Sequence, residues 1–216
     1  MASGLLVLSS LLLMWTSPAF AGSDYLVGIG KADITGPVVD VNLMGYANAE
    51  QIAGGLHIRQ FARAFMVADA KNSTHRFVFV NMDACMASQA VTFTVIAKLK
   101  ELYGPLYTEQ NVALSGTHTH SGPAGYLQYV VYDITSLGFI PQTFDALVDG
   151  VVLSIQRAHN SLRPGSLSVG VGELLEANIN RSPTAYLANP EEERAQFKFN
   201  IDKDMTLVKF EDEGGR

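Results

Sequence analysis

The sequence predicts an α/β fold in which βαβ units are arranged around a mixed, largely parallel sheet. Three observations favour this class. Segments rich in β-branched and aromatic residues alternate with two longer segments of helical periodicity, and glycine and proline separate them. Hydrophobic residues make up 48% of the 216 positions, which is enough to form one sizeable core.

The N-terminal half begins with strands. Residues 25–32 alternate loosely between apolar and polar side chains and predict a first strand, which a turn at Gly36-Pro37 follows. Residues 63–69 and 76–83 are both rich in β-forming residues. A short polar segment joins them, so we expect a hairpin.

The first helix is expected to begin at Ser88, because apolar residues then recur at helical spacing until Gly104-Pro105. Residues 112–115 predict the next strand. Strand, helix and strand form a right-handed βαβ crossover. This crossover would bring the carboxyl ends of residues 76–83 and 112–115 to one edge of the sheet, where ligands bind in open α/β folds.

A second helix is expected to be capped by Thr143 and to end near Arg163-Pro164-Gly165, since apolar residues recur on one face between them. Residues 167–171 and 205–211 predict two further strands, and residues 212–215 predict a hairpin turn. No partner strand follows that turn. A strand without a neighbour exposes unpaired backbone groups, so we expect a fragment of a longer protein.

The formal net charge is −6, and no cluster of lysine and arginine occurs. Domains that bind nucleic acid normally carry such a cluster. The composition therefore argues against a nucleic-acid partner.

Residues 1–21 predict a secretory signal peptide. Residues 5–14 are almost continuously apolar, and Pro18-Ala19-Phe20-Ala21 has the small-residue pattern of a cleavage site. The apolar run is about ten residues, too short to span a bilayer; an uncleaved membrane anchor is the alternative. Cleavage after Ala21 would place the protein in the secretory pathway, secreted or at a lumenal or extracellular membrane surface.

Two further residues bear on this compartment. Asn72 begins an Asn-Ser-Thr triplet, which is an N-glycosylation acceptor, in the polar segment of the predicted hairpin. Cys85 is the only cysteine, so an internal disulfide is impossible. We expect Cys85 to be a small buried residue near the end of a strand.

His118 and His120 are the strongest candidates for a functional site. They follow a predicted strand within a run of small residues, and residues two apart in an extended segment point to the same side. Both imidazoles could bind one metal ion, for which zinc is preferred, or one could bind metal while the other transfers protons. Loop histidines bonded to backbone are the alternative.

Three other observations accompany the histidines. Asp83, at the end of the preceding strand, could be a third metal ligand or could orient one imidazole by a hydrogen bond; a turn-forming residue is the alternative. Arg181 in a predicted loop could hold an anionic or polarised oxygen, or form a surface salt bridge. On a helix, Tyr126, Tyr129 and Tyr132 would share a face that lines a substrate channel or belongs to the core.

Four blocks of this sequence resemble the neutral ceramidase family. The longest holds both histidines and is far more specific than a bare His-x-His. The similarity extends from about residue 26 to residue 210, with the blocks in the family's order. The blocks are Asn42-Leu43-Met44-Gly45-Tyr46, Leu114-Ser115-Gly116-Thr117-His118-Thr119-His120-Ser121-Gly122-Pro123-Ala124-Gly125-Tyr126, Asn180-Arg181-Ser182-Pro183 and Asn189-Pro190-Glu191-Glu192-Glu193-Arg194.

The resemblance implies a zinc-dependent amidase that cleaves ceramide to sphingosine and a fatty acid. It implies that His118 is a zinc ligand, and that His120 and Arg181 lie in the active site, where one transfers a proton and the other holds the substrate oxygen. The implied partners are ceramide and related sphingolipids, with a membrane surface as their source. We expect Met44, Tyr46 and Tyr126 to line the slot for the acyl chains.

The resemblance also implies functional parts that lie beyond residue 216. Family members carry a second zinc-binding histidine, a glutamate and a tyrosine ligand, and a serine in a Gly-Asp-Val-Ser-Pro-Asn motif. We therefore expect residues 22–216 to be the incomplete N-terminal portion of a larger catalytic domain, inactive by itself. A catalytically dead secreted protein that binds lipid or a partner, and a zinc amidohydrolase for another N-acyl substrate, are the alternatives.

Overall fold

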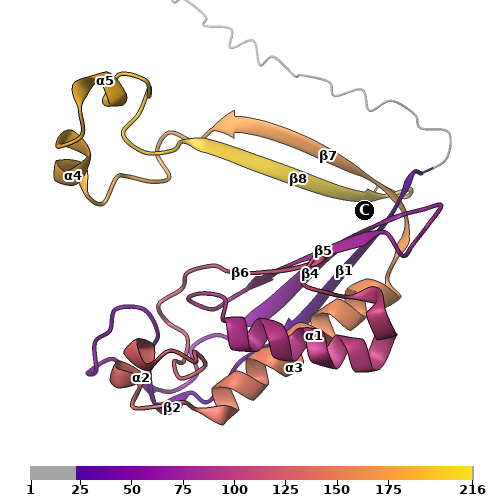
Figure 1. The fold of residues 1–216 in the computed structure, drawn as a ribbon, viewed down its shortest axis with the longest axis horizontal. Helices are drawn as coiled ribbons and strands as arrows, with labels where there is room; N and C mark the ends of the chain where they lie inside the picture. The colour runs from indigo at the N-terminus through magenta and orange to yellow at the C-terminus, as the bar shows by residue number, and fades with distance from the viewer. Residues whose placement is uncertain (1–22, 216) are drawn as a thin grey trace, which may run out of the picture.

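The computed structural model describes residues 23–215, so the predicted signal peptide lies outside the described part of the chain. Six strands form one mixed sheet in the order β6-β5-β4-β1-β7-β8, and two short strands pair separately (Figure 1). The main sheet consists of β1 (Tyr25–Asp33), β4 (Phe61–Asp69), β5 (Arg76–Met82), β6 (Val112–Gly116), β7 (Arg163–Glu173) and β8 (Asp204–Asp212). The separate pair consists of β2 (Val39–Asn42) and β3 (Ile52–Gly54).

The two long helices, α1 and α3, cover one face of the main sheet (Figure 1). The β7–β8 hairpin extends away from this body and carries a small helical lobe at its far end (Figure 1). The helices are α1 (Gln89–Tyr103), α2 (Val130–Ser136), α3 (Pro141–Asn160) and, in the lobe, α4 (Pro183–Leu187) and α5 (Glu191–Arg194); a 3₁₀ turn at Gly104–Leu106 follows α1.

Small residues allow α3 to lie close to the sheet. In β4 every second residue is buried, and three of these four residues are alanine (Ala62, Ala64, Met66 and Ala68). In β1, Gly30 lies directly beneath the helix, and a Cβ atom there would overlap the carbonyl oxygen of Ser154. This close approach buries the apolar face of α3 against the strands, which removes it from water and forms the main core.

The α/β class and the mixed sheet are confirmed, but the parallel share is smaller than the sequence predicts. Among the described strands, only β5 and β6 pair in parallel; β1–β4, β1–β7, β4–β5 and β7–β8 are antiparallel. A parallel pair needs a long crossover, whereas a short loop joins antiparallel neighbours. The helix α1 provides the one such crossover between neighbouring strands, as the sequence predicts.

The helix boundaries follow local capping chemistry. The Ser88 side chain accepts a hydrogen bond from the backbone N–H of Val91 at 3.4 Å, which confirms the predicted start of α1. The predicted cap of α3 is wrong, because this helix begins at Pro141 and Thr143 is buried inside its first turn. Proline suits that position, since the first N–H groups of a helix have no partner within it.

The strand β8 does not lack a neighbour. It pairs antiparallel with β7, from Gly165 opposite Asp212 to Glu173 opposite Asp204. The prediction of an unpartnered strand was wrong because its partner precedes it in the chain, beyond a 30-residue excursion from residue 174 to residue 203.

The face of the sheet opposite α1 and α3 carries large apolar side chains. Phe77 and Phe79 are 43% and 38% exposed on β5. A cavity of about 500 Å³ separates these rings from the β7–β8 hairpin. Its lining is almost wholly apolar: Phe65, Val67, Phe77, Phe79, Leu167, Val208 and Phe210.

Within residues 23–215 no single helix has both the length and the hydropathy needed to cross a bilayer. The helices α2 and α3 meet these criteria only as a pair, and they are bent by 115° at their junction.

The contact between Gly30 and α3 gives a prediction about stability. Gly30→Ala forces β1 and α3 apart and is expected to lower the free energy of unfolding by about 2 kcal/mol, as overpacking does. Gly172→Ala is the matched control, because it is also a strand glycine but has open space around it. Urea unfolding of both variants checks this; equal stability would contradict the packing described above.

Candidate metal and catalytic site

The parallel pair β5–β6 forms the base of the site. Two loop segments, residues 83–86 and 117–121, leave the carboxyl ends of these strands side by side. The backbone N–H of Thr117 donates to the Met82 carbonyl at 2.9 Å, and that of His118 to the Ala84 carbonyl at 3.1 Å. The site therefore lies at the sheet edge that the predicted crossover indicated.

His118 is held by its backbone and by its ring. Its φ is 64°, in the left-handed region that residues with a side chain rarely adopt. Its Nδ1 lies 2.9 Å from the carbonyl oxygen of Cys85, so Nδ1 carries the hydrogen and donates it. The lone pair is then on Nε2, so this nitrogen can accept a hydrogen bond or bind a ligand.

His120 faces the same space as His118, as the i, i+2 spacing predicts. Their Nε2 atoms are 3.2 Å apart, and their rings meet edge to face with centroids 4.7 Å apart. On its other side the His120 ring meets the ring of Tyr46, with centroids 4.2 Å apart. The Nδ1 atom of His120 is buried without a hydrogen-bond partner among the described residues.

Residues 42–45, from the N-terminal half of the chain, pack against the His120 segment. The Met44 N–H donates to the Gly122 carbonyl at 2.9 Å, and the Ala124 N–H donates to the Asn42 carbonyl at 2.8 Å. This pairing places Gly45 against the His120 ring. Gly45 has a φ of 139°, and a Cβ atom there would overlap the imidazole, so only glycine suits the position.

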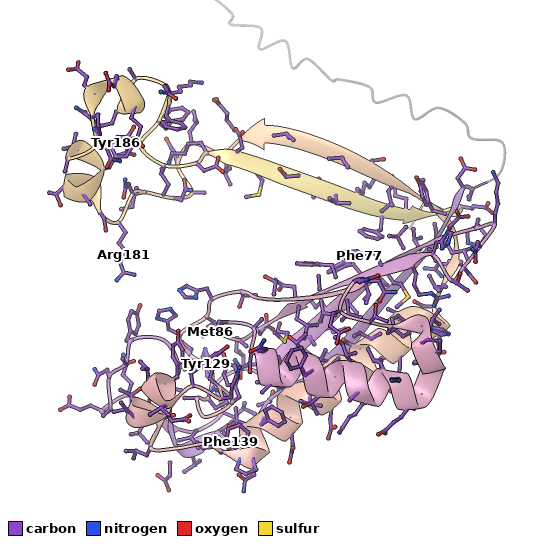
Figure 2. The ribbon with its side chains drawn as sticks, in the orientation of Figure 1. Phe77, Met86, Tyr129, Phe139, Arg181 and Tyr186 are labelled. Atoms are coloured by element: carbon purple, nitrogen blue, oxygen red, sulfur yellow. The ribbon has the colours of Figure 1, made fainter. Side chains whose placement is uncertain are left out.

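Arg181 joins the site from the segment between β7 and α4. It lines a cavity of about 640 Å³ together with His118, His120, Tyr46 and Gln51. Figure 2 shows its side chain pointing from the lobe toward the body of the protein. Among residues 23–215 it forms no ion pair, so the surface salt bridge considered above is not formed.

Asp83 has other partners than the histidines. Its carboxylate accepts hydrogen bonds from Arg63 at 2.7 Å and 3.0 Å and from the Phe61 backbone N–H at 3.0 Å. Within the described chain no hydrogen bond joins Asp83 to either imidazole. The Cys85 carbonyl, rather than the Asp83 carboxylate, orients His118.

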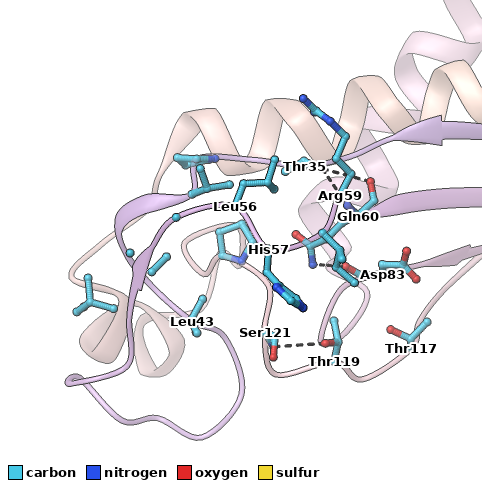
Figure 3. A pocket seen from close by; sticks show the side chains of 18 of the residues that line it. Thr35, Leu43, Leu56, His57, Arg59, Gln60, Asp83, Thr117, Thr119 and Ser121 are labelled. Carbon is cyan, nitrogen blue, oxygen red and sulfur yellow. Dashed lines mark hydrogen bonds between the residues drawn. The ribbon is translucent and has the colours of Figure 1, made fainter.

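The Asp83–Arg63 pair lines a second cavity, also of about 640 Å³, behind the histidine segment (Figure 3). Thr117 and Thr119 face this cavity, so alternate residues of the segment face opposite sides. Partial burial opposes ionisation of Asp83, but the hydrogen bonds from Arg63 and Phe61 outweigh it and hold the pKa of the carboxyl below its usual value.

Two of the expected substrate-lining residues belong to the core instead. Met44 is 8% exposed and Tyr126 is 2% exposed. The Tyr126 hydroxyl donates to the Met86 carbonyl at 3.1 Å, and burial raises its pKa to about 12. Tyr126 and Tyr129 precede α2, so the three tyrosines form no helical stripe within residues 23–215. Of the three expected lining residues, Tyr46, which is 62% exposed, does line the cavity of the histidines.

The sequence-predicted glycosylation site lies far from this region. Asn72 is exposed in the turn between β4 and β5, and its side-chain oxygen accepts a hydrogen bond from the Thr74 hydroxyl at 2.6 Å. The position is accessible, and glycosylation of Asn72 stays a prediction.

The donor set fits a zinc ion at His118. The chemistry of the His118 ring supports this fit, because Nδ1 donates to the Cys85 carbonyl and the lone pair is left on Nε2, at the cavity. Cys85 also lies near, with potential ligand atoms of all three residues within 4.8 Å of one another. Its buried thiol lies 3.6 Å from Nδ1 of His118, the ring nitrogen that donates to the Cys85 carbonyl.

Fold and site together define an α/β protein with an imidazole-lined polar cavity at the carboxyl ends of its strands. The chain belongs to the neutral/alkaline non-lysosomal ceramidase family, since the model of the N-terminal region of that family matches residues 25–216. This confirms the resemblance seen in the sequence.

Relatives and solved structures agree. The chain is 58% identical to the neutral ceramidase of Oryza sativa subsp. japonica over 207 residues, which is 96% of this chain and 26% of the relative. It is 59% identical to neutral ceramidase 3 of Arabidopsis thaliana, over 94% of this chain and 27% of the relative. The neutral ceramidase structure from Pseudomonas aeruginosa matches 90% of this chain and 30% of its own, with a TM-score of 0.85 and 46% identity.

Gly45→Ala is expected to displace the His120 ring and to lower the free energy of unfolding by about 1–3 kcal/mol, because the new Cβ overlaps the imidazole. Gly55→Ala is the control, since no heavy atom lies within 4 Å of the Cβ position. The imidazole NMR signals of His120 should shift in the first variant alone. Unchanged signals in Gly45→Ala would mean that the two blocks do not pack as described.

The Asp83–Arg63 pair predicts a pH dependence of stability. Because folding lowers the pKa of Asp83, its contribution is present above the unfolded-state pKa near 3.9 and is lost as the pH falls through the lower folded value. Asp83→Asn should therefore be less stable than the wild type at pH 7, with the difference shrinking below about pH 4. Urea unfolding against pH tests this, with exposed Glu109→Gln as control; a constant difference would contradict it.

Proposed function

We propose that this chain forms the N-terminal part of a secreted neutral ceramidase, a zinc-dependent hydrolase that cleaves the N-acyl bond of ceramide to sphingosine and a fatty acid. One observation carries the proposal. Three blocks that are distant in the sequence meet at one cavity, where His118 presents the lone pair of Nε2 beside His120, Tyr46 and Arg181. Family membership and the names of the relatives support the same reaction.

His118 would hold the zinc ion through Nε2, with its ring fixed by the Cys85 carbonyl. When bound, zinc supplies a Lewis acid that polarises the amide carbonyl and activates water at neutral pH. The second histidine, the glutamate and the tyrosine that the resemblance implies would complete the ligand set from beyond residue 216. We therefore propose that residues 22–216 are inactive alone.

His120 and Arg181 would act on the substrate. The leaving amine must gain a proton, and His120 is placed beside the metal ligand to donate one. The guanidinium of Arg181 faces the same cavity without an ion-pair partner in the described chain, so its charge is available for the carbonyl oxygen or the oxyanion. The ring of Tyr46 covers one side of His120 and limits its access to water.

Location and substrate supply follow from the sequence. Signal-peptide cleavage after Ala21 and glycosylation of Asn72 would accompany secretion, and ceramide and related sphingolipids would reach the cavity from a membrane surface. A solved structure of a ceramidase complexed with C2 is similar to this chain, with a TM-score of 0.84 and 46% identity, which supports a ceramide-like ligand.

His118→Ala tests the zinc assignment in the full-length reading frame that contains this sequence. We expect loss of about one zinc ion per chain and a fall in ceramide hydrolysis of at least 10³-fold, as the removal of a central catalytic group causes. His75→Ala is the matched control, because His75 is exposed in the β4–β5 turn. Zinc content by mass spectrometry and fatty-acid release are the two measurements.

The outcomes separate the alternatives. Zinc retained with activity lost would assign His118 to proton transfer rather than ligation. A wild type that binds zinc and cleaves other N-acyl substrates but not ceramide would support a different amidohydrolase, and one that binds lipid without cleaving it would support the catalytically dead protein. Ceramide hydrolysis by residues 22–216 alone would contradict the proposed incompleteness.

A further inference from the structure

Gln51 is a polar residue of the His118–His120 cavity that the proposed mechanism does not use. Its side chain lines the cavity together with both histidines and Arg181. Its Oε1 atom is buried and has no hydrogen-bond partner among the described residues. Buried polar atoms in proteins are nearly always bonded, so this oxygen calls for a donor from elsewhere.

The position of Gln51 is fixed by its backbone. The Gln51 N–H donates to the Asn48 carbonyl at 3.1 Å, and the Gln51 carbonyl accepts from the Leu43 N–H at 2.8 Å. The buried amide of Asn42 adds two bonds, to the Asn48 carbonyl at 2.8 Å and to the Gln51 carbonyl at 3.2 Å. The backbone of Gln51 is therefore anchored to β2 and to residues 43–48, which fixes the point from which its side chain leaves the chain.

The lining of the cavity does not satisfy this oxygen. Glu50 is an acceptor when ionised, and Tyr46, Ser121 and Arg181 line the cavity without donating to Gln51. An N-acyl amino alcohol such as ceramide has two types of donor, its amide N–H and its hydroxyl groups. The amide nitrogen must gain a proton as the bond breaks, and a fixed acceptor there would compete for it. A hydroxyl group keeps its hydrogen throughout the reaction.

We propose that Gln51 is a substrate-binding residue whose Oε1 accepts a hydrogen bond from a hydroxyl of the amino-alcohol head group. This bond would set the head group so that the acyl carbonyl faces His118 and Arg181. The inference rests on the proposed function and deepens it, because it assigns recognition of the head group to a particular residue.

The test compares Gln51→Leu and Gln51→Glu in the full-length enzyme, with ceramide and with analogues that lack the 1-hydroxyl or the 3-hydroxyl group. Leucine has a similar size but no acceptor, so kcat/KM for ceramide should fall roughly tenfold. Glutamate keeps an acceptor oxygen and should retain most of the activity. Gln110→Leu, at an exposed turn before β6, is the matched control and should equal the wild type.

The analogues identify the hydroxyl. Removing the group that Gln51 binds should cost the wild type roughly tenfold and should cost Gln51→Leu nothing more, because the two changes remove one interaction. Fully additive losses with both analogues would overturn the proposal, as would equal impairment of Gln51→Glu and Gln51→Leu. A wild type without activity on ceramide would overturn the proposed function itself, which is a different result from an active enzyme that is indifferent to Gln51.

Discussion

The hydrogen bond from His118 Nδ1 to the Cys85 carbonyl is the interaction on which the site depends. It fixes the tautomer, turns the ring and leaves Nε2 facing the cavity. A backbone carbonyl can do this reliably because β5 and β6 are locked in parallel register, from Val78 opposite Val112 to Met82 opposite Gly116, so the loops that leave them keep a constant separation. The left-handed backbone of His118 is strained, and it is maintained by the backbone bonds of Thr117 and His118 together with the ring bond to Cys85.

The sequence predicted the centre of the site better than its surroundings. The i, i+2 spacing predicts that His118 and His120 face one side, and their rings do meet, although the left-handed backbone of His118 departs from the extended segment on which the prediction rested. Gly45 packs on His120, and the Asn42 side chain donates a hydrogen bond to the Gln51 carbonyl. Both contacts join residues that are not neighbours in the sequence, so no local pattern indicates them. The prediction for Met44 failed for a related reason. In a sequence, an apolar residue that lines a site cannot be distinguished from one that is buried in the core, as Met44 is.

The fold shows the same division. Periodicity located the six strands of the main sheet and both long helices but missed the short β2–β3 pair, and the Ser88 cap was correct because capping is a local exchange of hydrogen bonds. Strand order was not predictable in this way, since β1 lies between β4 and β7 and thus pairs with residues 28 to 44 and 136 to 140 positions further along the chain. The antiparallel pairs around β1 result from this order. Among the described residues, no helix covers the second, apolar face of this sheet, opposite α1 and α3.

The placement of Arg181 links the far end of the fold to the chemistry. The arginine comes from the excursion between β7 and β8, so its distance from the histidines is set by a long hairpin rather than by the core. A positive charge without an ion-pair partner in residues 23–215 costs little while the cavity is hydrated. In the proposed mechanism it would become a strong ligand for a developing oxyanion once substrate displaces the water, because Coulomb interactions strengthen as the local dielectric falls. The hairpin thus holds a charge that is useful chiefly when the cavity is filled.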